Sequence, residues 1–441
     1  MGVVQPRTLI SHLLRRAAFG DTEAEIQRYM ALGFERAVDT LLHPERIPDT
    51  IDQMLADQVI DTSTAGGLQT AWLVRMRHTQ RPLLEKMTLF WHGHFATAIS
   101  KVRDPLVMQW QNDTFRLHAL GNFRDLAHAM ARDPAMLRWL DGNQNRKAAP
   151  NENFVRELME LFTIGIGNYS EDDVKAGARS FTGWHIDPTV MAFTFRPGAH
   201  DYGVKAFLGQ SGSLDGGDVI DALVAHPSTG RRLATRLFKF FVHDEPSVAE
   251  IDRLAAIYSA EHFEIRPMLQ AIFYSPEFRS EKAYHALVKS PTELVIGSLK
   301  QLQAETTWQD ILPAMRRMGQ ELFNPPNVKG WDGGRGWVST STLLERYNVA
   351  SRMVTARNDP TRTSIDPAQV LTGSAAGIDG LVDHCLQLLV DGDVAPEVRS
   401  ELIQYVRSGP GAAEQLTPAA VDEKVRGLLH LIMSLPVYQM N

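Results

Sequence analysis

Apolar side chains recur at helical spacing along almost the whole chain, and this periodicity is the feature that most restricts its fold. The clearest stretch is 151–165, in which Asn151 is placed to cap the first turn and Gly165 to end the last. Its apolar residues follow the i, i+4, i+7, i+8 pattern of a helix face that packs on a core: Phe154, Leu158, Leu161 and Phe162. Such stretches predict a mainly α fold.

One stretch departs from the helical spacing. Between Trp184 and Phe195 apolar residues alternate on both sides of Pro188, as they do in short β-strands. We therefore expect one large helical domain over residues 1–357 that carries every motif, with a single small β-hairpin inserted at about 183–210. Glycine-rich loops are expected at 198–217, after the hairpin, and at 330–336.

The remainder of the chain is expected to be a linker and a C-terminal helical region, 358–441, packed on the main domain. The first nine residues of this region are rich in Thr and Ser and lie beside prolines, which is typical of a linker. The total length of 441 residues is compatible with this single large domain and with two or three smaller ones.

Composition excludes several classes of protein. The net charge of −7 offers no basic field for nucleic acid. No apolar run approaches the roughly 20 residues of a membrane-spanning helix. The single cysteine, Cys385, excludes an internal disulfide and most thiolate metal sites.

Arg15 and Arg16, followed by two alanines and Phe19, have the look of a twin-arginine export signal. Polar residues, beginning with Asp21 and Glu23, then stand where such a signal needs a long apolar segment. We therefore expect no targeting segment in this sequence, and the compartment stays open.

The first candidate site is a polar stripe on the helix predicted at 151–165. Asn153, Glu157 and Glu160 follow i, i+4, i+7 beside the apolar face, and carboxylates at the edge of a buried face can have shifted pKa values. Arg156 can hold an anionic substituent or pair with Glu152, four residues before it. The alternative is an ordinary solvated helix face.

The second candidate is a divalent-metal site at His92 and His94. Gly93 between them can break the helix, and in extended backbone two residues separated by one point the same way. With Glu157 or Glu160 they would form a two-histidine, one-carboxylate site. The alternative is that they meet the last carbonyls of a helix.

Two loops supply the remaining candidates. His200 and Asp201 can act as general acid or base, and Lys205 can hold an anion, unless the segment is only a turn. In the loop 324–337, Lys329 can bind a polar ligand and Trp331 can form an aromatic platform for a sugar ring. Alternatively, the tryptophans of this loop fill a helical core.

Taken in order, six motifs resemble the bacterial family known as domain of unknown function 1800. They are LLRRAAFG at 13–20, FWHGHF at 90–95, NENFVRELMEL at 151–161, FTGW at 181–184, HDYGVK at 200–205 and VKGW at 328–331. The resemblance runs from about Thr8 to the C-terminus. It implies export to the periplasm or beyond and a sulfatase- or phosphatase-like protein partner, although we expect no export signal in this sequence. No activity comes with the resemblance.

Three functions are compatible with these residues. The favoured one is a hydrolase acting on a glycan or on a modified envelope or extracellular polymer. Glu157 and Glu160 would be its acid and base, and His200 or Asp201 could replace either. The second is a non-catalytic binding or maturation partner of the sulfatase- or phosphatase-like protein. The third is a metal-dependent enzyme that uses His92, His94 and a glutamate.

Overall fold

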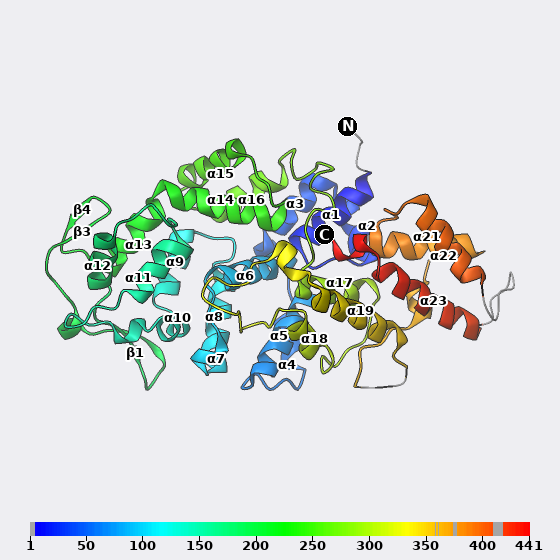
Figure 1. Ribbon diagram of the computed structural model, residues 1–441, viewed down its shortest axis with the longest axis horizontal. Helices are drawn as coiled ribbons and strands as arrows, with labels where there is room; N and C mark the ends of the chain where they lie inside the picture. The colour runs from blue at the N-terminus through cyan, green and yellow to red at the C-terminus, as the bar shows by residue number, and fades with distance from the viewer. Residues whose placement is uncertain (1–4, 358, 360, 374–376, 409–417) are drawn as a thin grey trace.

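The computed structural model describes residues 5–357, 359, 361–373, 377–408 and 418–441, and these residues are mainly helical (Figure 1). The first twelve α-helices are α1 (Pro6–Ala17), α2 (Glu23–Leu32), α3 (Phe34–Leu42), α4 (Ile51–Ala56), α5 (Ala65–His78), α6 (Pro82–His94), α7 (Ile99–Val102), α8 (Pro105–Leu117), α9 (Phe123–Ala131), α10 (Pro134–Trp139), α11 (Asn153–Glu157) and α12 (Glu171–Ser180).

The second part of the chain continues the helical pattern. Its α-helices are α13 (Gly216–Ala225), α14 (Pro227–Phe241), α15 (Val248–Ala260), α16 (Ile265–Phe273), α17 (Pro291–Gln301), α18 (Ile311–Arg317), α19 (Thr340–Thr355), α20 (Pro367–Val370), α21 (Gly377–Val390), α22 (Pro396–Arg407) and α23 (Pro418–Met433). Short 3-10 turns lie at η1 (Pro44–Arg46), η2 (Gly142–Gln144), η4 (Pro197–Ala199), η5 (Gly334–Trp337) and η6 (Pro436–Gln439). The prediction of a mainly α fold is confirmed.

The β structure amounts to two small antiparallel hairpins in the described residues. The predicted one is formed by β1 (Trp184–Asp187) and β2 (Ala192–Phe195), with Trp184 opposite Phe195. A second hairpin, β3 (Lys205–Phe207) and β4 (Gln210–Gly212), lies in the segment 198–217 that was expected to be loop, so that expectation was wrong there. Its turn residues, Leu208 and Gly209, both have positive φ, which suits a two-residue hairpin turn.

The buried side chains form two hydrophobic clusters. The first contains buried side chains of α1–α3, α6, α9 and α11–α16. The second joins α4 and α5 to α17–α19 and α21–α23. In Figure 1 the elements α9–α13 occupy one end of the molecule and α21–α23 the other, with α1, α6 and α17 between them. The C-terminal helices share their cluster with α17–α19, which lie on the other side of the expected linker.

The predicted helix at 151–165 forms, but with two geometries. After α11 the backbone continues as a π-helical turn, η3 (Leu158–Phe162). The N-cap of α11 is Glu152 and not Asn151 as expected, although Asn151 Oδ1, one residue earlier, accepts a hydrogen bond from the N–H of Asn153. π-turns widen a helix and release carbonyls from the α pattern. The carbonyls of Leu161 and Phe162 are accordingly bound by side chains from other helices.

Among the described helices, none combines the length and the apolarity needed to cross a bilayer.

Candidate functional site

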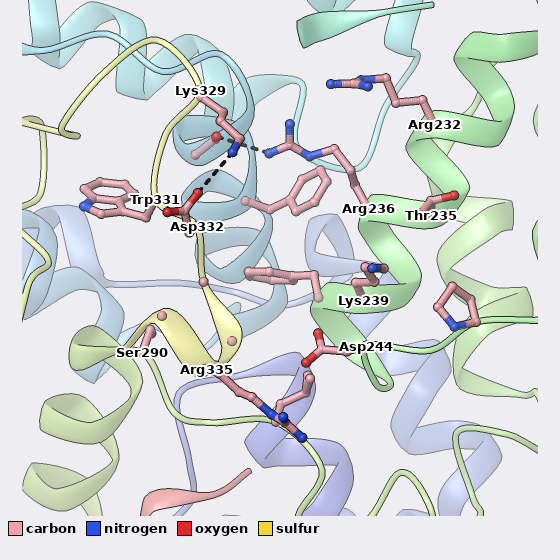
Figure 2. Close-up of a pocket in the computed structure, with 18 of the residues that line it drawn as sticks. Arg232, Thr235, Arg236, Lys239, Asp244, Ser290, Lys329, Trp331, Asp332 and Arg335 are labelled. Atoms are coloured by element: carbon pink, nitrogen blue, oxygen red, sulfur yellow. Dashed lines mark hydrogen bonds and ion pairs between the residues drawn. The ribbon is translucent and has the colours of Figure 1, made fainter. Parts of the chain in front are cut away.

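A cavity of about 1390 Å³ lies in the middle part of the molecule, between its two ends. One wall is α14. The opposite wall is the glycine-rich loop that precedes and includes η5, and the end of α6 closes the back (Figure 2). The C-terminal end of the π-turn and the start of α17 also contribute to the lining, so five segments far apart in sequence meet here.

The α14 wall is cationic. Its inner face is buried in the first hydrophobic cluster. Arg232, Arg236 and Lys239 follow one another at i, i+4 and i+7 and therefore share the other face of the helix. Figure 2 shows these three side chains extending from α14 toward the loop that carries Lys329 and Asp332. The helix thus presents a row of positive charges to the cavity.

Backbone carbonyls hold the two arginines in place. Arg232 Nε donates to the carbonyl of Leu161 at 2.9 Å, and Arg236 Nη2 donates to the carbonyl of Gly93 at 3.3 Å. Within the described ranges neither guanidinium has a carboxylate oxygen within 4.0 Å, although Glu160 lies near enough to favour the charge of Arg232. Burial lowers the pKa of Arg232, and burial together with the neighbouring Arg232 lowers the pKa of Arg236 to about 10.

The loop wall is held against α6 by a contact between two glycines. Gly330 has φ +85°, and a Cβ at this position would lie 2.4 Å from the carbonyl oxygen of Gly93. The same carbonyl accepts from Arg236, so the loop, α6 and α14 meet at one peptide. Only glycine permits both the left-handed backbone and this approach.

Aromatic rings line the part of the cavity between the two walls. Phe90 and Phe240 are in edge contact, with ring centroids 5.2 Å apart. Trp331 is half-buried, and its ring lies 5.5 Å from that of His92. Beside it, Lys329 Nζ lies 3.2 Å from Asp332 Oδ1 on the exposed side of the loop. The cavity therefore combines apolar ring faces with an excess of cations.

The carboxylates that line the cavity differ in their pairing. Glu245 pairs with Lys282 at 3.2 Å, Asp332 pairs with Lys329, and Glu293 forms a buried pair with Lys86. For Asp244 the described residues supply no ion-pair partner. Figure 2 shows its carboxyl group near the C-terminal end of α14, below Lys239.

The predicted acid–base pair lies beside the cavity rather than in its lining. Burial, and secondarily the charge of Glu160, raises the pKa of Glu157. Glu160 Oε2 accepts a hydrogen bond from the hydroxyl of Tyr169 at 3.3 Å. The helix that carries both glutamates reaches the cavity only with Leu161 and Ile164.

The other predicted residues of this helix serve its surface and its start. Arg156 binds Glu152 at 3.0 Å and Glu171 at 2.9 Å, which are ion pairs on the outside of the molecule. Asn153 donates from Nδ2 to the carbonyl of Leu140 at 3.1 Å. Both side chains stay outside the cavity lining.

The expected metal site does not form, because the two histidines point into different packing environments. His92 Nε2 accepts from the backbone N–H of Phe323 at 3.0 Å, and His94 Nε2 donates to the carbonyl of Phe162 at 2.9 Å. Both imidazoles are buried, and burial lowers both pKa values, that of His92 to about 3. Helix α6 continues through Gly93, so the extended geometry that would have aligned the rings is missing. The part of the chain that is described contains no group of three or more potential ligands, so a glutamate does not join them.

The loop residues His200, Asp201 and Lys205 are held by hydrogen bonds within their own segment. Arg179 Nε donates to Asp201 Oδ2 at 2.7 Å, which lowers the pKa of that carboxyl to about 2. Lys205 Nζ is bound by the carbonyls of Asp201 and Leu214 at 2.6 and 2.8 Å. His200 Nδ1 donates to the carbonyl of Thr182 at 2.7 Å. These contacts fix the β3–β4 hairpin on α12, at the end of the molecule in Figure 1 that lies beyond α13.

Of the residues predicted from the sequence, the structure brings Lys329 and Trp331 into the cavity. It adds Arg232, Arg236 and Lys239, which the sequence analysis did not single out. A signal for them exists, because Arg232 and Arg236 have no acidic residue three or four positions away on either side. A solvated helix face more often alternates its charges.

Comparison with known proteins gives one match. Residues 12–440 match the family model described as protein of unknown function (DUF1800). No curated protein and no solved structure matches the chain. Over nearly its whole length, therefore, the chain belongs to the DUF1800 family of proteins of unknown function.

Proposed function

We propose that the protein binds an anionic polymer, most simply a negatively charged glycan, in the cavity between α14 and the loop 329–337. The observation that carries this proposal is the pair Arg232 and Arg236. Two like charges one helical turn apart repel each other, and both lose hydration where they stand. A bound anion would relieve both costs at once.

The size and the lining of the cavity support a polymer rather than a small ion. Pockets for single drug-sized molecules have volumes of roughly 300–1,000 Å³, and this cavity has about 1390 Å³. Its cations continue from Arg232 to Lys239 along α14 and recur at Lys329 and Arg335 on the loop. A chain with regularly spaced negative charges would meet several of these cations in turn.

The aromatic side chains favour rings in that polymer. Phe240 and Trp331 are half-buried and border the cavity beside the cations. Aromatic faces provide apolar contact area at low entropic cost, as the C–H face of a sugar ring needs. A glycan that carries sulfate, phosphate or carboxylate groups presents both features.

Binding of defined oligosaccharides tests the proposal. We expect heparin and polygalacturonate fragments to bind and neutral dextran fragments not to bind, with the fluorescence of Trp331 as one readout and calorimetry as the other. In the variant Arg232→Gln/Arg236→Gln, affinity should fall at least about 100-fold, because two charge-assisted contacts of about 1.5–3 kcal/mol each are lost. The matched control is Arg399→Gln, which removes an arginine of α22 whose partner is Asp383 of α21. Equal binding of neutral and anionic fragments would rule the proposal out.

A hydrolase acting on the bound polymer is the second candidate. Asp244 favours it, because this carboxylate borders the cavity and has no ion-pair partner among the described residues. An unpaired carboxylate can take or give a proton as general acid or base. Hydrolysis of a glycosidic bond ordinarily needs a second carboxyl group, and Glu245 is the neighbouring candidate in the lining.

Variants separate the two functions. If the protein is a hydrolase, Asp244→Asn should abolish the release of reducing ends from a bound anionic glycan and leave affinity within about threefold. If the protein only binds, wild type and Asp244→Asn should both leave every bound fragment intact. The control for Asp244→Asn is Asp383→Asn, which changes an exposed acid on α21. Asp391 would not serve as a control, because its side chain is buried and pairs with Arg15.

A further inference from the structure

Each cavity arginine is anchored by one hydrogen bond and leaves its other donors for a ligand. A guanidinium has five N–H groups in a planar fork. Arg232 uses Nε on the carbonyl of Leu161, and Arg236 uses Nη2 on the carbonyl of Gly93. In the described part of the chain the remaining nitrogens of both guanidinium groups have no protein acceptor, and none of these unbonded nitrogens is sealed from water.

The two forks are fixed about one helical turn apart. Positions i and i+4 are separated by roughly 6 Å along a helix axis, and both side chains lie on the same face of α14 (Figure 2). The carbonyls that anchor them belong to different elements, the π-turn and α6, so the arginines cannot simply swing away from each other. An acceptor placed between them can receive hydrogen bonds from both.

A tetrahedral oxyanion meets this geometry better than a carboxylate does. A carboxylate has two oxygens in one plane and is satisfied by one bidentate fork. A sulfate or phosphate ester has three terminal oxygens that point in different directions, so one group can accept from two forks at once.

The surroundings of the pair indicate what the ester is attached to. The rings of Phe90 and Phe240 line the cavity and contact each other, and Trp331 borders the cavity from the loop with its ring beside that of His92. The strands β1–β4 lie away from the lining, so the cavity offers no sheet edge on which an acidic peptide could pair its backbone. A ring that carries the ester has apolar faces to contact there.

We propose that Arg232 and Arg236 form a subsite for the sulfate or phosphate ester group of a saccharide ring, with the ring lying against Phe90 and Phe240. This assignment rests on the proposed function and narrows it. It makes the arginine forks, and not only their charge, the determinant of which anionic glycan binds.

The test replaces the planar guanidinium group of Arg236 and keeps its positive charge. Arg236→Lys keeps the cation but cannot donate two parallel hydrogen bonds. We expect its affinity for heparin fragments to fall at least about tenfold, and its affinity for polygalacturonate fragments of equal charge to change by less than about threefold. Arg399→Lys, at the control arginine of α22, should change neither. Circular dichroism and thermal melting establish that each variant is folded.

The two sources of the oxyanion differ in their pH dependence. A phosphate ester loses its second charge below about pH 6, whereas a sulfate ester keeps its single charge. We therefore expect phosphorylated fragments to bind more weakly at pH 5 than at pH 7.5 and sulfated fragments to bind equally. Competition by inorganic sulfate and by inorganic phosphate against labelled heparin measures how tightly the subsite binds the oxyanion when no sugar ring is attached.

The outcomes distinguish a failure of the ester subsite from a failure of the proposed function. If wild type binds polygalacturonate as tightly as heparin, or if Arg236→Lys retains heparin affinity, the ester subsite is wrong while anionic glycan binding stands. If polyglutamate displaces heparin at equal charge concentration, the occupant is an acidic peptide and the subsite is wrong. If none of these anions binds to wild type, the proposed function itself fails.

Discussion

Removal of the charge at Arg236 should make the unliganded protein more stable while it abolishes binding. In the folded protein the cation is disfavoured by burial and by Arg232, which lowers its pKa to about 10. The unfolded chain carries no such penalty. The penalty is present in full at pH values below the folded pKa and disappears only as the pH rises above about 10, so it acts at pH 7.5.

The size of the effect follows from this pKa and from the contacts of the side chain. The lowered pKa corresponds to about 3 kcal/mol, and partial exposure of the half-buried guanidinium to water reduces this to about 2 kcal/mol. Replacement by methionine keeps the packing of the stem but loses the hydrogen bond to Gly93, which costs about 1 kcal/mol. Arg236→Met should therefore stabilise the fold by about 1 kcal/mol.

Thermal and urea unfolding at pH 7.5 measure this change. For 441 residues the entropy of unfolding makes 1 kcal/mol equal to about 1 °C in Tm. In the presence of heparin fragments the order should reverse, because the ligand raises the Tm of wild type only. The control is Arg231→Met, five residues earlier on α14. Arg231 is paired with Asp252, so its loss should leave stability unchanged or lower it by less than about 1 kcal/mol.

One result would refute the reasoning. If Arg236→Met lowers stability by 1 kcal/mol or more, measured with a folded protein and in the same buffer, the charge is satisfied within the protein. The cavity would then have no need of an anion, and the proposed function would lose the observation that carries it.

Three further predictions concern the scaffold. Gly330→Ala should weaken heparin binding and lower the Tm by more than Gly333→Ala does, because both residues have positive φ but only the Cβ at 330 meets a backbone oxygen; equal effects would contradict the glycine contact. Burial raises the pKa of Asp133 to about 7, so stability should fall as the pH rises from about 4 to 7, and Asp133→Asn should remove that slope in urea titrations. Burial also raises the pKa of Cys385 to about 12, so iodoacetamide should modify it in urea but not in the native protein, as mass spectrometry can show.

The helical architecture could be predicted because its signals are local. Ser170 and Ser290 each form the capping box that their sequences indicate, and the β1–β2 hairpin has the register that its alternation implies. The β3–β4 hairpin was missed because three-residue strands are too short to show a period of two. The π-turn was missed because its widening depends on partners outside the helix, Arg232 among them.

The candidate site could be predicted only in part, for a related reason. Lys329 and Trp331 stand out locally as a cation and an aromatic residue in a glycine-rich loop. The contact that brings this loop to the cavity joins Gly330 to Gly93, and nothing in either segment alone indicates the other. Arg232 and Arg236 lack acidic neighbours on their helix, but nothing in the sequence shows that the fold partly buries both beside a cavity.

The structure gives the histidine motif at 90–95 a different role from the metal ligation that was expected of it. Its imidazoles look like ligands in the sequence, but each bonds to a backbone group of another segment, Phe323 or Phe162. Between them, the carbonyl of Gly93 is closely approached by Gly330 and accepts a hydrogen bond from Arg236. The motif therefore holds the loop, the π-turn and α14 at fixed positions around the cavity. In the proposed function, side chains of the loop and of α14 contact the ligand, and the two histidines contribute by holding neighbouring segments in place.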